Sequence, residues 1–222
     1  MLFDLRSRGR RRTVQVVYLG LALLMGGGLV LFGVGAGNGL GGLLNAFTGQ
    51  GSGNAQSSAI SQQEKTALRQ TRQNPSNPAG WAALVNARWI SATSNNNNYN
   101  TSTATFTAAG KKKLAATTAA WQHYLQLTKK PDPNLAILAA RAYAQQGQYS
   151  GSAHAWEIQT LANPSSPKGY ECLAASAYAA KQTREGDLAL GKALSLVPKL
   201  SRNALKNQIT AAKTTPTVAQ AC

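Results

Sequence analysis

Acidic side chains are scarce in this chain, and most catalytic sites need them. The 222 residues contain 7 Asp and Glu against 23 Lys and Arg, and only two histidines. The six acids beyond residue 37 are scattered: Glu64, Asp132, Glu157, Glu171, Glu185 and Asp187. They form no paired-carboxylate set, and no Ser/His/Asp or Cys/His arrangement can be assembled from the chain. The sequence therefore predicts a protein that is not an enzyme and has no catalytic residues.

Metal and cofactor sites are not expected either. His154 and Glu157 are three residues apart and share one face of a predicted helix, as metal ligands can. No third ligand follows at a suitable spacing. No glycine-rich phosphate loop precedes a helix, because the glycines near 26–28 and 39–42 belong to an apolar run and the segment after it. We predict no metal ligands and no cofactor.

Cysteine is almost absent, since Cys172 and Cys222 are the only two. Two cysteines do not define a disulfide framework. In an oxidising compartment they could pair. The alternative is that Cys172 is a small packed side chain in a predicted helix, and that Cys222 carries a free thiol after a short tail.

Charge is missing altogether from residues 13–37, which read TVQVVYLGLALLMGGGLVLFGVGAG. About 20 apolar residues cross a hydrocarbon core of roughly 30 Å, so this run is long enough to span a membrane. The preceding segment 1–12 contains five arginines. Because excess Lys and Arg mark the cytoplasmic flank, we predict a single-pass signal anchor in the cytoplasmic membrane, with the N-terminus inside and the C-terminal domain extracytoplasmic. The alternative is a cleaved signal peptide, whose apolar region would be about 7–15 residues long.

The chain beyond the apolar run is strongly basic. Five arginines and Asp4 precede the run, so 18 of the 23 basic and 6 of the 7 acidic residues follow it, a net charge of +12. Such a balance favours acidic partners, including anionic lipid, acidic envelope polymers and acidic proteins. With the predicted topology, nucleic acid is not an expected partner.

The chain repeats itself after residue 58. Pro164 and Pro198 are 34 residues apart. The unit before Pro164 contains Tyr143, Gly147, Tyr149 and Trp156, and nearly the same positions of the next unit are occupied by Tyr170, Leu173, Ala174, Tyr178, Leu190 and Ala193. Large residues fill the space between paired helices, glycine permits the turn, and proline ends the second helix. Trp121 and Trp156 fall at equivalent positions, which predicts that both are buried.

These features resemble the tetratricopeptide repeat, a helix–turn–helix unit of about 34 residues. The resemblance implies an all-α fold, with a single transmembrane helix followed by a helical-repeat α-solenoid. The opening of the chain also resembles hypothetical repeat proteins of high-GC Gram-positive bacteria.

The expected layout is a basic segment 1–12, a transmembrane helix 13–37, a flexible tether 38–57, a repeat domain 58–213 and a tail 214–222. Within the repeat domain we expect a cap helix 58–72, repeats at about 78–130, 133–166 and 167–200, and a cap helix 201–213 with Ser201 as its N-cap. The first repeat carries a polar insertion, 93–111, expected to be a disordered loop or a flap that contacts a partner.

The resemblance further implies a concave groove lined by the first helix of each repeat. The groove positions are Asn86, Trp89 and Ile90, then Asn134, Ile137, Arg141 and Gln145, and finally Lys168, Glu171 and Tyr178. This mixture of aromatic, amide and basic groups suits a peptide backbone or a carboxylate. Asn86 and Lys168 match the set with which some family members clamp a C-terminal carboxylate, whereas Ala82, Leu138 and Cys172 depart from it.

The sequence thus predicts a membrane-anchored protein–protein interaction module, either an adaptor or chaperone-like, at the outer face of the cytoplasmic membrane. Its partner would be a protein or peptide in the concave groove. The alternative is a structural envelope protein whose basic domain binds anionic wall polymer or lipid. The sequence does not set the partner's identity or the oligomeric state.

Overall fold

The computed structural model describes residues 53–94 and 97–222. The predicted basic segment, the membrane helix 13–37 and the tether up to residue 52 lie outside the described residues. Within the described ranges, no helix is both long and apolar enough to cross a membrane.

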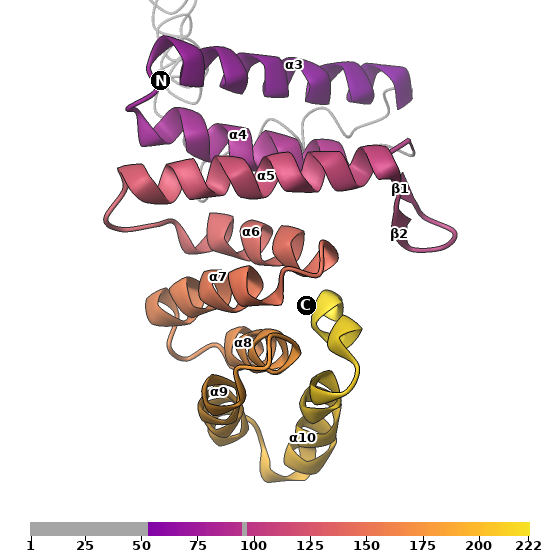
Figure 1. Ribbon diagram of the computed structural model, residues 1–222, viewed down its shortest axis with the longest axis vertical. Coiled ribbons are helices and arrows are strands. Elements are labelled where there is room, and N and C mark those ends of the chain that lie inside the picture. The colour runs from indigo at the N-terminus through magenta and orange to yellow at the C-terminus, as the bar shows by residue number, and fades with distance from the viewer. Residues whose placement is uncertain (1–52, 95–96) are drawn as a thin grey trace, which may run out of the picture. The chain divides into compact units, whose positions relative to one another are not determined.

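The described part of the chain is mostly helical, which confirms the expected all-α class (Figure 1). Its α-helices are α3 Gly53–Gln73, α4 Pro78–Thr93, α5 Ala108–Leu127, α6 Pro133–Gln145, α7 Tyr149–Ala162, α8 Pro167–Ala179, α9 Thr183–Leu196 and α10 Arg202–Thr210. Two short strands, β1 Tyr99–Asn100 and β2 Thr105–Phe106, form one antiparallel hairpin. Three 3₁₀ turns, η1 Lys199–Ser201, η2 Ala211–Lys213 and η3 Pro216–Ala221, lie in the C-terminal part.

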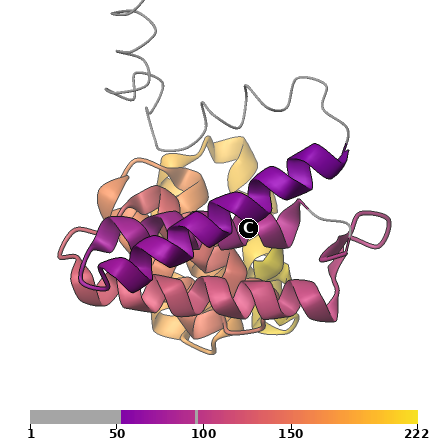
Figure 2. The ribbon, with the colours of Figure 1, turned by 90° about the horizontal axis from the view of Figure 1, so that it is seen from above.

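Helices that are consecutive in the chain pack against each other, and the resulting pairs stack in chain order. Helix α3 lies at the N-terminal end of this stack, against α4 (Figure 2). Helices α4, α6 and α8 each begin with a proline, whose missing N–H is not needed in the first turn. Asn77, Asp132 and Ser166 precede these prolines and cap the helices, each accepting a backbone N–H with its side chain. The prolines thus mark where each new helix pair begins.

Some element boundaries differ from the sequence expectation. Helix α3 begins at Gly53, so the last five residues of the expected tether are helical. Helix α5 begins at Ala108, within the expected insertion. Ser201 occupies the predicted N-cap position of α10, but its side chain makes no capping hydrogen bond. A 3₁₀ turn, η1, leads directly into α10 and gives Ser201 helical dihedral angles, which do not suit a capping side chain.

The core runs along the stack, and two large indole rings lie in it among many alanines and a smaller number of tyrosine, leucine and valine side chains. Trp121 and Trp156 are 1% and 3% exposed, which confirms that both are core residues. Fully buried alanines surround them, among them Ala120, Ala136, Ala139, Ala155 and Ala174. Because alanine side chains are small, neighbouring helices can approach closely around the tryptophans.

The turn between α6 and α7 depends on a left-handed residue. Gly147 has φ +72°, and the N–H of Gln148 donates to the carbonyl of Tyr143 at 2.9 Å, which closes the end of α6. The turn between α8 and α9 has the same hydrogen bonding, but its left-handed residue is Lys181, with φ +64°. The two turns are therefore equivalent in structure although only one contains glycine.

We expect Gly147→Ala to lower the free energy of unfolding by about 1–2 kcal/mol, because a Cβ strains a left-handed backbone. No atom lies within 4 Å of the position that this Cβ would occupy, so packing does not contribute. Gly191 in α9 is the matched control, since its Cβ also meets no atom and its backbone is helical. Gly191→Ala should raise stability by about 0.5–1 kcal/mol. Urea denaturation measures both, and equal effects from the two substitutions would contradict this account of the turn.

Candidate functional site

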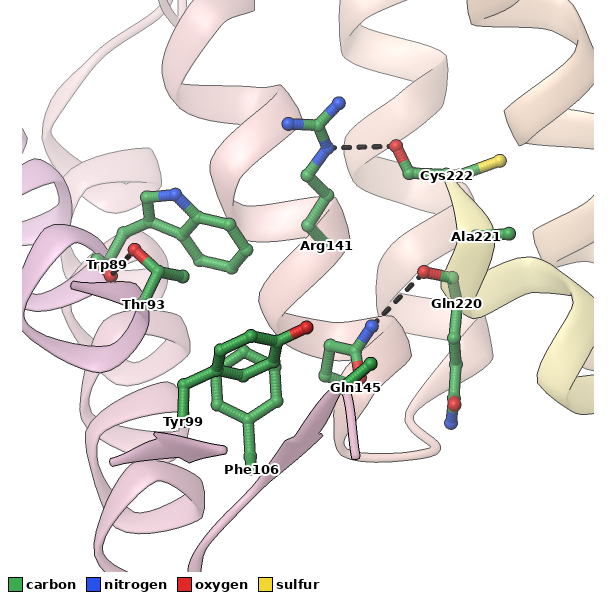
Figure 3. A pocket seen from close by; sticks show the side chains of 10 residues that line it. Trp89, Thr93, Tyr99, Phe106, Arg141, Gln145, Gln220, Ala221 and Cys222 are labelled. Carbon is green, nitrogen blue, oxygen red and sulfur yellow. Dashed lines mark hydrogen bonds between the residues drawn. The ribbon is translucent and has the colours of Figure 1, made fainter. Parts of the chain in front are cut away.

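A pocket of about 430 Å³ opens between α4, the hairpin, α6 and the C-terminal residues (Figure 3). Its lining combines aromatic rings with amide and guanidinium groups. The lining residues are Trp89, Thr93, Tyr99, Ala104, Phe106, Arg141, Gln145, Gln220, Ala221 and Cys222.

The hairpin supplies two of the three aromatic side chains. Tyr99 and Phe106 are directly opposite each other on β1 and β2, and their ring centroids are 4.8 Å apart. The base of the hairpin is fixed by Asn98, whose side-chain amide donates to the carbonyl of Ser91 in α4 at 2.8 Å. Gly110 of α5 packs against the Asn98 backbone so closely that any side chain there would collide with the carbonyl. These contacts hold the two rings at the rim of the pocket.

The hairpin lies within the insertion predicted at 93–111. The sequence expectation was a loop, disordered or acting as a flap, and the described residues 97–107 instead carry two paired strands. The prediction of groove residues missed Tyr99 and Phe106. One signal was available: these are the only two aromatic residues in a stretch that is otherwise polar or small.

Helix α6 contributes two polar side chains from adjacent turns. Arg141 and Gln145 are four residues apart and therefore lie on one face of the helix. The Nε of Arg141 donates to the main-chain oxygen of Cys222 at 2.9 Å. The side-chain amide of Gln145 donates to the main-chain carbonyl of Gln220 at 3.1 Å (Figure 3). Both predicted groove residues thus contact the main chain of an extra segment.

That segment consists of residues 214–222 and is called here the C-terminal segment. It contains η3, which packs against α8 and α6. Cys222 forms a disulfide with Cys172 of α8, with the two Cα atoms 5.6 Å apart. Ala219 of this segment is fully buried. Of the two alternatives that the sequence left open, a disulfide or free cysteines, the structure has the disulfide. Residues 214–222, which were expected to be a tail, cover part of the predicted groove.

The structure contradicts one predicted groove residue, Tyr178. Its side chain is 1% exposed, and its hydroxyl donates to the carboxylate of Asp187 in α9 at 2.6 Å. The ammonium of Lys213 lies 4.2 Å from the centre of the ring and 3.3 Å from Asp187. Burial, followed by the contact with Asp187, raises the pKa of Tyr178, and the same hydrogen bond lowers the pKa of Asp187. Tyr178 therefore links α8, α9 and η2, and it cannot contact a groove ligand.

Three of the predicted groove residues meet in the pocket: Trp89, Arg141 and Gln145. The others lie elsewhere on the first helices: Asn86, Ile90, Asn134, Ile137, Lys168 and Glu171. Ile137 packs against the core, and Asn134 is exposed at the start of α6. Lys168 and Glu171 form an ion pair with each other at 3.6 Å. The pocket is therefore confined to the α4 and α6 part of the expected groove.

The pocket contains one charged side chain. It belongs to Arg141, and the other side chains in the lining are uncharged. Among the described residues, the five ion pairs involve other cations, and none of the acidic side chains pairs with Arg141. The group that the Arg141 guanidinium contacts is the main-chain oxygen of Cys222, the last residue of the printed sequence.

A metal centre is not evident in the part of the chain that the structure describes, where no group of three or more His, Cys, Asp and Glu is close enough to hold an ion. His154 Nδ1 does lie 3.4 Å from a carboxylate oxygen of Glu157, as their spacing predicted. Both side chains are exposed on α7, and two residues alone do not make a metal-ligand set.

Comparison of the chain with models of protein families, with curated proteins and with solved structures found no match in any of the three. The description of this protein therefore rests on its own fold and pocket. The described part of the chain is an all-α stack of helix pairs, with a pocket on the side where the hairpin and the C-terminal segment lie.

Proposed function

We propose that the protein is a peptide-binding module of the tetratricopeptide-repeat type, which holds a segment of a partner protein in the pocket beside α4 and α6. A membrane anchor at residues 13–37 would place this module at the outer face of the cytoplasmic membrane. There it would act as an adaptor or in a chaperone-like role.

The observation that carries this proposal is the way α6 contacts the C-terminal segment. Gln145 donates to the main-chain carbonyl of Gln220, and Arg141 donates to the main-chain oxygen of Cys222. Main-chain carbonyls are present in every peptide, so donors placed to meet them suit peptide binding regardless of sequence. The contact between α6 and the C-terminal segment is thus an example of the contact that a partner peptide would make further along the same face of α6.

Three aromatic rings in the pocket lining provide an apolar surface for a side chain of the bound peptide. Trp89, Tyr99 and Phe106 line the pocket opposite Arg141 and Gln145 (Figure 3). Aromatic residues provide a large contact area at low cost in side-chain entropy and are enriched at protein interfaces. An apolar side chain of the partner would lie against these rings, while polar groups of α6 bind its main chain.

The repeat type is supported by spacing. Pro133 and Pro167 begin α6 and α8 and are 34 residues apart, and so are the left-handed residues Gly147 and Lys181. A period of 34 residues with two helices per unit is typical of the tetratricopeptide repeat.

A structural envelope protein remains the second candidate, because the net charge of +12 beyond residue 37 favours anionic wall polymer or lipid. Binding of that kind weakens steeply with salt, whereas binding through apolar and main-chain contacts changes less. Salt dependence therefore distinguishes the two candidates.

Photo-crosslinking in cells tests the proposal. A photoreactive phenylalanine replaces Tyr99 at the pocket, and the control replaces Leu161, which is 76% exposed on α7. We expect protein adducts from position 99 that mass spectrometry identifies, that are absent from position 161, and that are lost in the Trp89→Ala variant. Identical adducts from both positions, or recovery of wall or lipid material alone, would contradict the proposed peptide site and favour the envelope alternative.

A further inference from the structure

The helices at the N-terminal end of the stack contain almost no acidic side chains. Three basic residues lie on α3, one on α4 and three on α5, whereas Glu64 is the single acidic residue of these three helices. Glu64 is already engaged, because one carboxylate oxygen lies 2.6 Å from the ammonium of Lys113 and the other lies 3.7 Å from the Nε of Arg88. The other basic side chains at this end therefore have no acidic partner within these helices.

One side of α3 carries three of these cations. Lys65, Arg69 and Arg72 are separated by four and three residues, which places them on the same side of the helix, and all three are exposed. Ile60 and Ala67 are buried on the side that packs toward α4. Among the described residues, no acidic side chain pairs with any of the three cations. Lys65, Arg69 and Arg72 are called here the basic face.

Helix α5 adds positive charge near α3. The ion pair between Lys113 and Glu64 brings the second turn of α5 close to the middle of α3. Lys111 and Lys112 directly precede this ion pair in the chain, and both are exposed. Figure 2 looks onto this end of the stack, where α3 is the outermost of the described helices. Such a concentration of one charge attracts a surface that presents many anionic groups.

The chain before α3 indicates which anionic surface lies within reach. The apolar run ends at residue 37, and α3 begins at Gly53. The 15 residues between them cover at most about 50 Å in any conformation, since an extended chain advances about 3.3–3.6 Å per residue. With the proposed anchor in the bilayer, the start of α3 therefore stays within that distance of the lipid headgroups.

We propose that the basic face of α3 docks on the surface of a bilayer that contains anionic phospholipid. Each Lys or Arg held near such a surface strengthens binding by about fivefold, so three together strengthen it by about a hundredfold. No residue of α3 lines the pocket, so docking leaves the pocket open. Lipid docking of this kind is independent of peptide binding, and the choice of lipid as the partner rests on the proposed anchor.

Photo-crosslinking of the full chain in vesicles tests the docking. A photoreactive phenylalanine replaces Thr66, which is exposed and adjacent to Lys65, and the control replaces Leu161, which is 76% exposed on α7. The vesicles contain phosphatidylcholine alone or equal parts of phosphatidylcholine and phosphatidylglycerol. We expect at least about tenfold more lipid adduct from position 66 with phosphatidylglycerol present, and no such increase from position 161. Salt at about 1 M should remove the increase, because it shortens the Debye length to about 3 Å.

Two triple variants assign the effect to the basic face. Lys65→Gln, Arg69→Gln and Arg72→Gln together should reduce the adduct to its level in phosphatidylcholine alone. These side chains make no ion pair among the described residues, so the fold should be retained. The control makes the same change of charge, again to glutamine, at three exposed cations of the other end of the stack: Arg184, Lys199 and Lys206. This control should keep the increase.

Flotation of the same vesicles distinguishes docking from anchoring. Flotation of the chain with both kinds of vesicle, with equal adduct yields from position 66, would keep the anchor and overturn the docking. Flotation with phosphatidylglycerol vesicles alone, lost in the α3 variant, would support the docking and remove the anchor. Flotation with neither would overturn both. Recovery of wall polymer or protein in place of lipid from position 66 in cells would overturn the choice of lipid.

Discussion

Replacing Cys222 by serine is expected to lower the free energy of unfolding by about 4 kcal/mol. The disulfide joins residues 50 apart in sequence, and closing a loop of that length restricts the unfolded chain by about this amount. Among the described residues, the disulfide is also the only covalent cross-link between the C-terminal segment and α8. Urea denaturation under oxidising conditions measures the change.

Reduction of the wild-type protein is the matched control for this substitution. It should produce the same loss of stability as Cys222→Ser and should have no effect on the variant. Cys222→Ser is preferred to Cys172→Ser because Cys172 is fully buried, so a serine there would add the cost of a buried hydroxyl. A variant as stable as the oxidised wild type would show that the disulfide does not form in solution.

Replacing Trp156 by alanine is expected to lower the free energy of unfolding by about 3–5 kcal/mol, the usual cost of removing a large buried aromatic side chain. Trp156 is 3% exposed and packs in the core that connects α6, α7 and α8. Helix pairs of this kind are stabilised by their neighbours, so a cavity at the middle of the stack weakens both adjoining interfaces. Thermal or urea unfolding measures the loss.

Two further substitutions show whether this loss comes from packing. Among the described residues, no group accepts a hydrogen bond from the buried Nε1 of Trp156, so Trp156→Phe gives up volume but no hydrogen bond. We expect it to cost about 1–2 kcal/mol. Leu161→Ala, at a 76% exposed position of the same helix, should change stability by about 0.5 kcal/mol or less. An unchanged melting temperature for Trp156→Ala would mean that this side chain is not part of the core.

Several features of the candidate site could be predicted because they depend on residues close together in sequence. Arg141 and Gln145 are four residues apart on one helix, so their common face follows from helix geometry alone. Trp89 follows from the position of its helix in the repeat pattern. Tyr178 was misplaced because a helix turns by about 100° per residue, and a shift of one position moves a side chain from the groove to the contact with the paired helix.

The remaining features of the pocket depend on contacts between distant parts of the chain. Tyr99 and Phe106 reach the pocket only because Asn98 is anchored on α4 and fits against Gly110 of α5. Cys222 reaches Cys172 only because η1, α10 and η2 turn the chain back along the stack to α8. Neither the anchoring of the hairpin nor the return of the chain to α8 follows a periodic pattern that could be recognised in the sequence.

The sequence by itself determined the all-α class, the starts of α4, α6 and α8, the two buried tryptophans and three of the residues that line the pocket. Local rules account for these: proline and caps begin helices, apolar periodicity selects the buried face, and a fixed period orders the units. Tertiary structure alone decided the pairing of the cysteines, the aromatic rim from the hairpin and the covering of the groove by the C-terminal segment. Each of these required segments far apart in sequence to meet, and which of them meet depends on how the whole stack packs.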